Sequence, residues 1–368
     1  MATKTTTALE TPLRDHLDRL AARETADVPF ISLYLDRSPD ANGSREHCTT
    51  FLKRTLADHR KALKGSSRRS FEQSVKRIEE YLSASVSKSA NGLAVFACAD
   101  GEDFFDAIQL DVPFQGNSFF ADSMPHLYPL ARLNDQYPRY AALLLDTNSA
   151  RLFVFGLGAA EDLAEVQNPK TRRTMSGGWA QARYQRHVDN YHLHHIKEVV
   201  DVLDRVVTAE RLNQIVVACD EVARPILRSH LPKHLAERVI EMMHLDVRTT
   251  PEHQVLADTL EAVRMADARE DAVQVERMLN AWRARGLAVV GPTATLEALD
   301  ARQVEELLIA ARPELLHTRR SSSPEDRLML ADALVLKAQQ NSARIRFIED
   351  ARLLEEVGGV GAMLRFRI

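Results

Sequence analysis

Two adjacent glycines, Gly177 and Gly178, precede Trp179 and Gln181 and form the most distinctive short pattern in the sequence. Glycine lacks a Cβ and adopts backbone conformations closed to other residues, so such a pair lets the main chain approach a ligand and aim its N–H groups at it. On spacing alone, a plain β-turn before a helix is the better explanation. The residues around the pair therefore decide between the two interpretations.

Basic and aromatic residues surround the glycine pair. Lys170, Arg172 and Arg173 lie before it, and Arg183, Tyr184, Arg186 and His187 lie after it. If a helix begins near Trp179, Arg183 and Arg186 are three residues apart and share a face. A basic, glycine-rich segment of this kind favours contact with RNA phosphates, with tyrosines as stacking surfaces. The alternative is a solvated helix face with a tyrosine in the core.

A second basic cluster, Lys64, Arg68 and Arg69, lies between two amphipathic stretches, roughly Glu46 to Leu63 and Ser70 to Ser83. Apolar residues recur there at intervals of three and four, which predicts two helices. Gly65 would break the first helix, and a serine would cap the second. The expected element is a helical hairpin with a basic tip, a further candidate RNA contact; an exposed basic loop of no special function is the alternative.

The sequence predicts no metal and no cofactor. His187, His192, His194 and His195 could supply zinc ligands, but no cysteine or HExxH pattern accompanies them. The three cysteines are scattered, which suits a reducing compartment. Gly156-Leu157-Gly158 follows a strand but lacks the third glycine of a dinucleotide site.

Composition indicates an ordinary globular protein. The chain has 368 residues, is 45% hydrophobic and 27% charged, and has a formal net charge of -4. One core rarely exceeds roughly 250–300 residues, so two or three domains are expected. The negative net charge argues against a protein that coats nucleic acid without sequence preference, but it allows a local basic patch. No apolar segment resembles a secretory signal or a membrane span, which predicts a cytoplasmic protein without membrane association.

The elements that would carry these residues alternate between strands and helices. Strands are expected at Pro29–Leu35, Gly92–Ala99 and Asp103–Leu110 in the first third, and at Ala141–Asp146, Arg151–Phe155 and Leu212–Ala218 in the second. A long helix is expected from about Trp179 to Val207. In the last third, strands are expected at Gly286–Val290, Val304–Ile309, Arg344–Phe347 and Met363–Ile368. This pattern predicts an α/β (α+β) fold.

Several segments, in order along the chain, resemble the archaeal/eukaryotic class-1 peptide chain release factors and their Pelota-like relatives. Residues 91–96 (NGLAVF) are similar to the family's "NGLVVF" strand, and residues 177–186 (GGWAQARYQR) to its "GGQSxxRFxR" signature. Residues 295–299 (TLEAL), 304–308 (VEELL) and 358–366 (GGVGAMLRF) are similar to its "TLxAL", "VExLL" and "GGIGGILRY" segments. The order of these weak matches makes the resemblance specific, and it points to the diverged bacterial, Balon-like group.

The resemblance implies three domains: an N-terminal domain with the helical hairpin (1–135), an RNase H-like middle domain with the Gly-Gly-Trp loop (136–255), and a C-terminal α/β domain similar to kink-turn-binding ribosomal proteins (256–368). It also implies a ribosome-binding translation factor that occupies the A site as a hibernation or rescue factor. The expected partners are rRNA, the A site, the peptidyl-transferase centre and a delivering translation GTPase.

The resemblance leaves an enzymatic alternative open, namely peptidyl-tRNA hydrolysis. In release factors the glycine pair and the following glutamine act at the peptidyl-transferase centre, where a backbone N–H stabilises developing charge. Gly177 and Gly178 match, but Trp179 occupies the glutamine position and Gln181 lies two residues later. An indole has one N–H donor and no acceptor, so it cannot position a water as an amide does. A regulator that binds RNA or protein away from the ribosome is the third alternative. The hairpin tip lacks the family's codon-reading residues, so stop-codon reading is unsupported.

Overall fold

The computed structural model describes residues 13–23, 27–100, 103–157, 159–167, 179–246, 249–317 and 323–366, with the backbone alone for 159–167 and 179–189. The chain is a mixed α/β protein, as the sequence predicted, and the strands among these described residues form three sheets. It divides into two compact units. One contains residues 137–269, and the other contains residues 9–136 together with 270–368.

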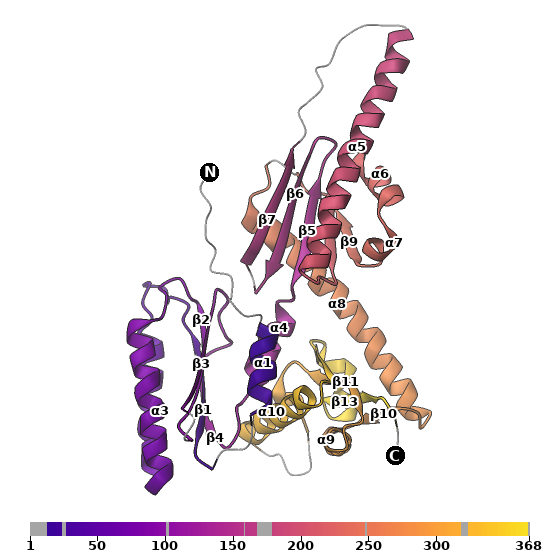
Figure 1. Cartoon of the computed structure of the whole chain (residues 1–368). Coiled ribbons are helices and arrows are strands. Elements are labelled where there is room, and N and C mark those ends of the chain that lie inside the picture. Colours follow the sequence, from indigo (N-terminus) through magenta and orange to yellow (C-terminus); the bar gives the residue numbers. More distant parts are fainter. Residues whose placement is uncertain are drawn as a thin grey trace. The chain divides into compact units, whose positions relative to one another are not determined.

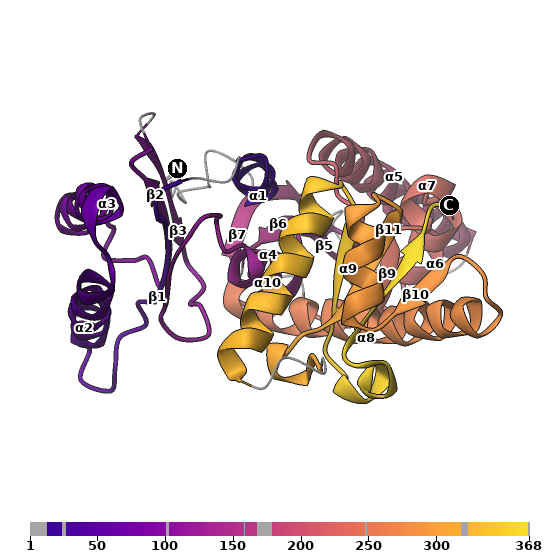
Figure 2. The ribbon, with the colours of Figure 1, turned by 90° about the horizontal axis from the view of Figure 1, so that it is seen from below.

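The N-terminal sheet has the strand order β3-β2-β1-β4 and is antiparallel throughout. Its strands are β1 (Phe30–Asp36), β2 (Gly92–Cys98), β3 (Phe104–Leu110) and β4 (Ser118–Asp122). Successive side chains of a strand point to opposite faces. Ile31, Leu33 and Leu35 therefore all pack against the same helices, α2 (Glu46–Ala62) and α3 (Gly65–Ala84). Figure 2 shows this hairpin on one side of the sheet and α1 (Leu13–Ala21) on the other.

The C-terminal sheet has the order β10-β13-β11-β12 and mixes parallel with antiparallel pairing. Its strands are β10 (Ala288–Val290), β11 (Val304–Ala310), β12 (Arg344–Ile348) and β13 (Val360–Leu364). The accompanying helices are α9 (Pro292–Asp300), α10 (Pro324–Gln340), the last part of α8 (Glu252–Arg283), and the short η1 (Pro313–Leu315), η2 (Ala351–Leu353) and η3 (Glu355–Val357). Val275 and Met278 of α8 pack on this sheet with Leu308 and Ile348.

The N-terminal and C-terminal segments form one unit because helices from both pack together. Helices α1 and α4 (Tyr128–Gln136) contact α10, and Gln339 donates to the Asp18 carboxylate at 2.6 Å. Tyr128 donates its hydroxyl to the Ala311 carbonyl at 3.0 Å and stacks edge-on against Phe347. These contacts of α1 and α4 with α10 and Phe347 join residues that are more than 180 positions apart in the chain. They form the interface between the N-terminal and C-terminal segments, called the seam below.

The middle sheet has the order β7-β6-β5-β8-β9, with antiparallel pairing among the first three strands and parallel pairing from β5 to β9. This is the strand arrangement of the RNase H-like fold that the family resemblance implied. The strands are β5 (Tyr140–Leu145), β6 (Ser149–Gly156), β7 (Ala159–Gln167), β8 (Ile215–Cys219) and β9 (Val239–Met243).

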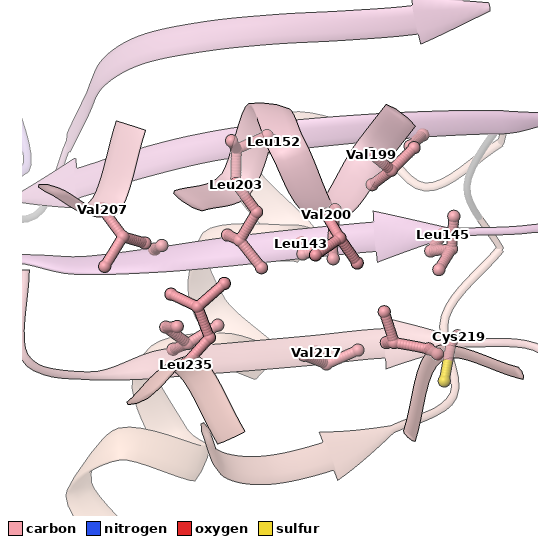
Figure 3. Close-up of a cluster of buried hydrophobic side chains, with 14 of the residues drawn as sticks. Leu143, Leu145, Leu152, Val199, Val200, Leu203, Val207, Val217, Cys219 and Leu235 are labelled. Carbon is pink, nitrogen blue, oxygen red and sulfur yellow. The ribbon is translucent and has the colours of Figure 1, made fainter. Parts of the chain in front are cut away.

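Helices cover both faces of the middle sheet. One face is covered by α5 (Trp179–Ala209), α6 (Ala223–His230) and α7 (Lys233–Ala236). There Leu203 of α5 lies in one buried apolar cluster with Leu143 of β5 and Val217 of β8 (Figure 3). On the other face, Val255 and Val263 of α8 pack against Tyr140 and its neighbours. Both faces of the central strand β5 are buried, which matches its continuous apolar sequence.

Several elements differ from the sequence prediction. Strand β9 lies in a region that was expected to be helical, and neither α4 nor β4 was expected. The last strand ends at Leu364 instead of continuing from Met363 to the terminus. Helix α8 is continuous through the predicted domain boundary at 255/256. The division into three domains remains a prediction.

Candidate functional site

The tip of the α2–α3 hairpin is tighter than the sequence suggested. Helix α2 ends at Ala62 and α3 begins at Gly65, so only Leu63 and Lys64 connect them. The prediction that α3 begins near Ser70 is wrong. Gly65 adopts φ +61 with nothing within 4 Å of a Cβ position, and this lets the chain reverse without a longer loop. Arg68 and Arg69 consequently lie in the first turns of a helix.

Contacts behind the tip fix its position on the sheet. Arg60 of α2 donates two hydrogen bonds from Nε and one from Nη2 to the Glu72 carboxylate of α3, at 3.0–3.1 Å. The hydroxyl of Ser70 donates to the Ala99 carbonyl at the end of β2 at 2.8 Å. Phe71 is completely buried between the hairpin and the sheet. The sequence analysis missed this Arg60–Glu72 pair, whose spacing of 12 residues gives no helical signal.

The tip is strongly basic although the chain as a whole is acidic. Residues 53–69 contain seven basic residues and one acidic residue. That acidic residue, Asp58, pairs with Lys61 at 3.1 Å. Lys64, Arg68 and Arg69 are exposed, and none of the ion pairs among the described residues involves them. This charge excess was available from the sequence as a count, and the structure places it at one end of the hairpin.

The basic residues at the start of α3 oppose the helix dipole. The N-terminal end of a helix carries a partial positive charge, and a cation there is unfavourable by about 0.3–1 kcal/mol. The first turn of α3 holds no acidic residue and Lys64 makes no side-chain cap. Arg68 and Arg69 therefore do not stabilise the helix locally. Their charge, together with uncapped backbone N–H groups, suits an external phosphate.

The second candidate region lies at the start of α5. Gly177, Gly178, Lys170, Arg172 and Arg173 lie outside the described residues. Helix α5 begins at Trp179, as predicted, and the backbone of Gln181, Arg183, Tyr184, Arg186 and His187 lies within it. The structure does not describe the side chains of these helical residues.

Helix α5 is much longer than its packing against the sheet requires. Among residues 190–209, the part of α5 whose side chains the structure describes, His195 and Ile196 are the first fully buried residues. At 1.5 Å rise per residue, Trp179 lies roughly 24 Å further along the helix axis. Figure 1 shows this half of α5 extending beyond the strands of its own unit. The segment that resembles the release-factor signature is therefore attached to a projecting helix end.

The histidines of α5 whose side chains the structure describes, His192, His194 and His195, form no metal site. His195 is 1% exposed and contacts the backbone of the β5–β6 turn at Asp146 and Ser149. Burial lowers its pKa, so the imidazole is neutral at physiological pH. Among the described residues, no group of three or more His, Cys, Asp or Glu side chains could hold a metal ion. His195 is a structural residue that positions the β5–β6 turn.

In the described part of the chain, no helix has both the length and the apolar character needed to cross a membrane.

Residues 125–264 match the family described as bacterial archaeo-eukaryotic release factor family 10. This match spans α4, the complete middle sheet and the first part of α8. Over these residues the resemblance to archaeo-eukaryotic release factors that was predicted from the sequence is confirmed, and the matching family is described as bacterial. No curated protein matches the chain.

Several solved structures are similar to this chain at low sequence identity. The archaeal translation termination factor aRF1 is 16% identical, with 96% of this chain and 98% of that chain covered and a TM-score of 0.26. Archaeal Pelota, in a model of its ribosome-bound state with ABCE1, is 14% identical (96% and 94% covered, TM-score 0.41). Dom34 of S. cerevisiae, a translation termination-like factor, is 10% identical (75% and 80% covered, TM-score 0.42). We draw no functional conclusion from similarities at this level.

Proposed function

We propose that this protein binds the ribosome in the A site and acts there as a hibernation or rescue factor. The family match over residues 125–264 carries the proposal, because the matched family is described as one of archaeo-eukaryotic release factors. The basic hairpin tip supports it, since exposed arginines that do not stabilise their own helix are suited to bind an external anion, and rRNA supplies phosphates. A cytoplasmic location goes with this function.

In this proposal the two candidate regions contact different parts of the ribosome. The tip around Lys64, Arg68 and Arg69 faces the decoding centre. The segment from Gly177 to His187 enters the peptidyl-transferase centre at the end of the projecting helix α5, with Lys170, Arg172 and Arg173 beside it. A translation GTPase is the proposed delivery partner.

Co-sedimentation with purified 70S ribosomes, with and without A-site tRNA, tests the proposal. Binding that A-site tRNA blocks is the expected result. Absence of binding to empty and to tRNA-filled ribosomes would refute it and would favour an RNA- or protein-binding role away from the ribosome.

The contribution of the tip is measured with a triple variant, Lys64→Gln, Arg68→Gln and Arg69→Gln. The matched control removes three exposed cations of the same unit that lie away from the tip, Lys76, Lys88 and Arg312. Each lost phosphate contact reduces the magnitude of the slope of log affinity against log salt concentration by about 0.7–0.9. The loss of three contacts in the tip variant should therefore reduce this magnitude by about 2–3. Equal losses in both variants would show that only the net charge matters.

Peptidyl-tRNA hydrolysis is a second candidate function, favoured by the position of the glycine pair directly before the first residue of α5. Helix N-termini present free N–H donors that can stabilise developing negative charge. The variant Gly178→Ala separates the two functions. A hydrolase would lose release of peptide from stalled ribosomes, whereas a hibernation factor would keep most of its ribosome occupancy.

A further inference from the structure

One end of the C-terminal sheet gathers four chain segments that are distant in sequence. The connections α8–β10, α9–β11 and α10–β12 and the end of β13 all lie there, because β10, β11 and β12 run parallel to one another and antiparallel to β13. The Leu364 amide donates to the Leu287 carbonyl at 3.0 Å, and the Arg365 amide donates to the Gln303 carbonyl at 2.8 Å. The four segments therefore form one continuous surface, called the arginine end below.

The three helix–strand connections of this surface share one backbone geometry. Arg285, Arg302 and Ser342 each have a positive φ (53°, 55° and 52°) directly after a helix. In each case the following amide bonds back to a carbonyl five residues earlier, as Gly286 does to Ala281 at 2.7 Å. Glycine is the residue normally favoured at this position because it has no Cβ. Two of the three positions hold arginine instead.

The arginine end includes three exposed arginines, Arg283, Arg302 and Arg365. Arg283 and Arg302 are exposed and have no acidic partner among the described residues. Arg365 donates only to the uncharged carbonyls of Asn341 and Ser342, at 3.3 and 3.1 Å. The two acidic residues nearby are already paired, Asp300 with Lys337 and Glu305 with Arg344.

Large apolar side chains are exposed beside these arginines. Trp282, in the last turn of α8, is 43% exposed, and Phe366, two residues beyond β13, is 47% exposed. Leu287 is also 43% exposed. Exposed aromatic rings between unneutralised arginines are the features with which proteins bind single-stranded nucleic acid, because rings stack on bases and cations meet phosphates.

We propose that the arginine end binds a single-stranded stretch of nucleic acid, with phosphates on Arg283, Arg302 and Arg365 and a base stacked on Trp282. The surface is separate in sequence from the hairpin tip and from the glycine pair. This inference does not rest on the proposed ribosomal function, since it requires only an accessible strand.

Helix dipoles offer a simpler reason for arginines in this place, because cations are favourable at helix C-terminal ends. The simpler reason predicts that arginine stabilises the connection. Glycine adopts a positive φ without strain, so replacing the arginine with glycine removes the charge and retains the backbone conformation. This substitution therefore tests the contribution of the charge to binding separately from its contribution to folding.

Trp282 provides a site-specific signal. The chain has two tryptophans, so a Trp179→Phe background leaves Trp282 as the sole indole. Its fluorescence is titrated with a 12-nucleotide poly-U RNA and with the matching poly-dT DNA at low salt. Quenching by stacked bases with both strands supports the proposal, and quenching by RNA alone supports it with a contribution from the 2′-hydroxyl. No quenching by either strand overturns it, whatever the ribosome assay shows.

The charge contribution is tested with the double variant Arg283→Gln and Arg302→Gly in the same background. Its matched control is Arg205→Gln and Arg211→Gly, in which Arg211 occupies the equivalent positive-φ position (53°) after α5 in the other unit. The first variant should bind the single strands at least ten-fold more weakly than its parent. The magnitude of its slope of log affinity against log salt concentration should fall by about 1.4, at about 0.7 per phosphate contact. The control should bind as its parent does. Equal behaviour of the two double variants would overturn the assignment of phosphates to these arginines.

Discussion

Asp332 of α10 is a buried carboxylate at the seam between the N-terminal and C-terminal segments. It is 6% exposed, accepts a hydrogen bond from the Tyr128 amide at 2.9 Å and lies 3.3 Å from Nδ1 of His126. The other side of His126 faces Asp122 at 3.5 Å, and its ring stacks on Phe120. Burial raises the pKa of Asp332 to about 6, and the nearby His126 acts in the opposite direction.

The raised pKa gives this carboxyl a defined effect on stability. The folded state binds its proton more tightly than the unfolded state, whose value is 3.8. Its stabilising contribution is therefore fully present below about pH 4 and is lost as the pH rises through about 6. A pKa that lies about two pH units above its value in the unfolded state corresponds to about 3 kcal/mol of folding stability, of which about 2 kcal/mol is lost between pH 4.5 and 7.

The substitution Asp332→Asn removes this titration and retains an acceptor for the Tyr128 amide. We subtract the wild type's free energy of unfolding from that of the variant at each pH. We expect this difference to be about 2 kcal/mol higher at pH 7 than at pH 4.5. Urea unfolding at both pH values, followed by Trp282 fluorescence in the Trp179→Phe background, measures the difference. Glu325→Gln, an exposed carboxylate on the same helix, is the control and should show no such dependence. An equal change with pH in Asp332→Asn and wild type would refute the reasoning.

Two further predictions concern the same unit. Gly359→Ala should be more destabilising than Gly65→Ala by about 1–3 kcal/mol, because both glycines have positive φ but only the Cβ at Gly359 would lie 2.6 Å from the Leu315 carbonyl oxygen. Urea unfolding of the two variants checks this, and equal losses would contradict it. Arg346→Met should cost about 3–5 kcal/mol, because it removes the guanidinium that lies 3.1 Å from the buried carboxylate of Asp271 and 3.4 Å from that of Glu306. Thermal unfolding measures this loss; a variant as stable as the wild type would show that the ion pair is dispensable.

The local elements of this protein could be predicted from its sequence. Periodic apolar residues indicated α2, α3 and α5, and short β-branched or aromatic runs indicated β1, β2, β5 and β11. These signals are local, because helix and strand periodicity depends on neighbours within one or two turns. The ordered family motifs likewise required only the linear sequence, and the family match confirmed the resemblance to release factors over residues 125–264.

The elements that the sequence missed depend on partners elsewhere in the chain. Strand β9 has weak alternation and is a strand because β8 supplies its hydrogen-bonding partner. Helix α4 is held by contacts with α10 and β12, which lie about 200 residues further along the chain. The start of α3 was misplaced because a glycine with positive φ allowed a two-residue connection that composition does not reveal.

The sequence by itself indicated the class of fold, the resemblance to release factors and the presence of a basic hairpin. Only the tertiary structure decided which charges act together. Arg60 and Glu72 neutralise each other and leave the hairpin tip basic, and the strand order β10-β13-β11-β12 brings arginines from separate segments to one end of a sheet. The physical reason is that sheet order and ion pairing are set by contacts between distant segments, whereas sequence patterns report only on near neighbours.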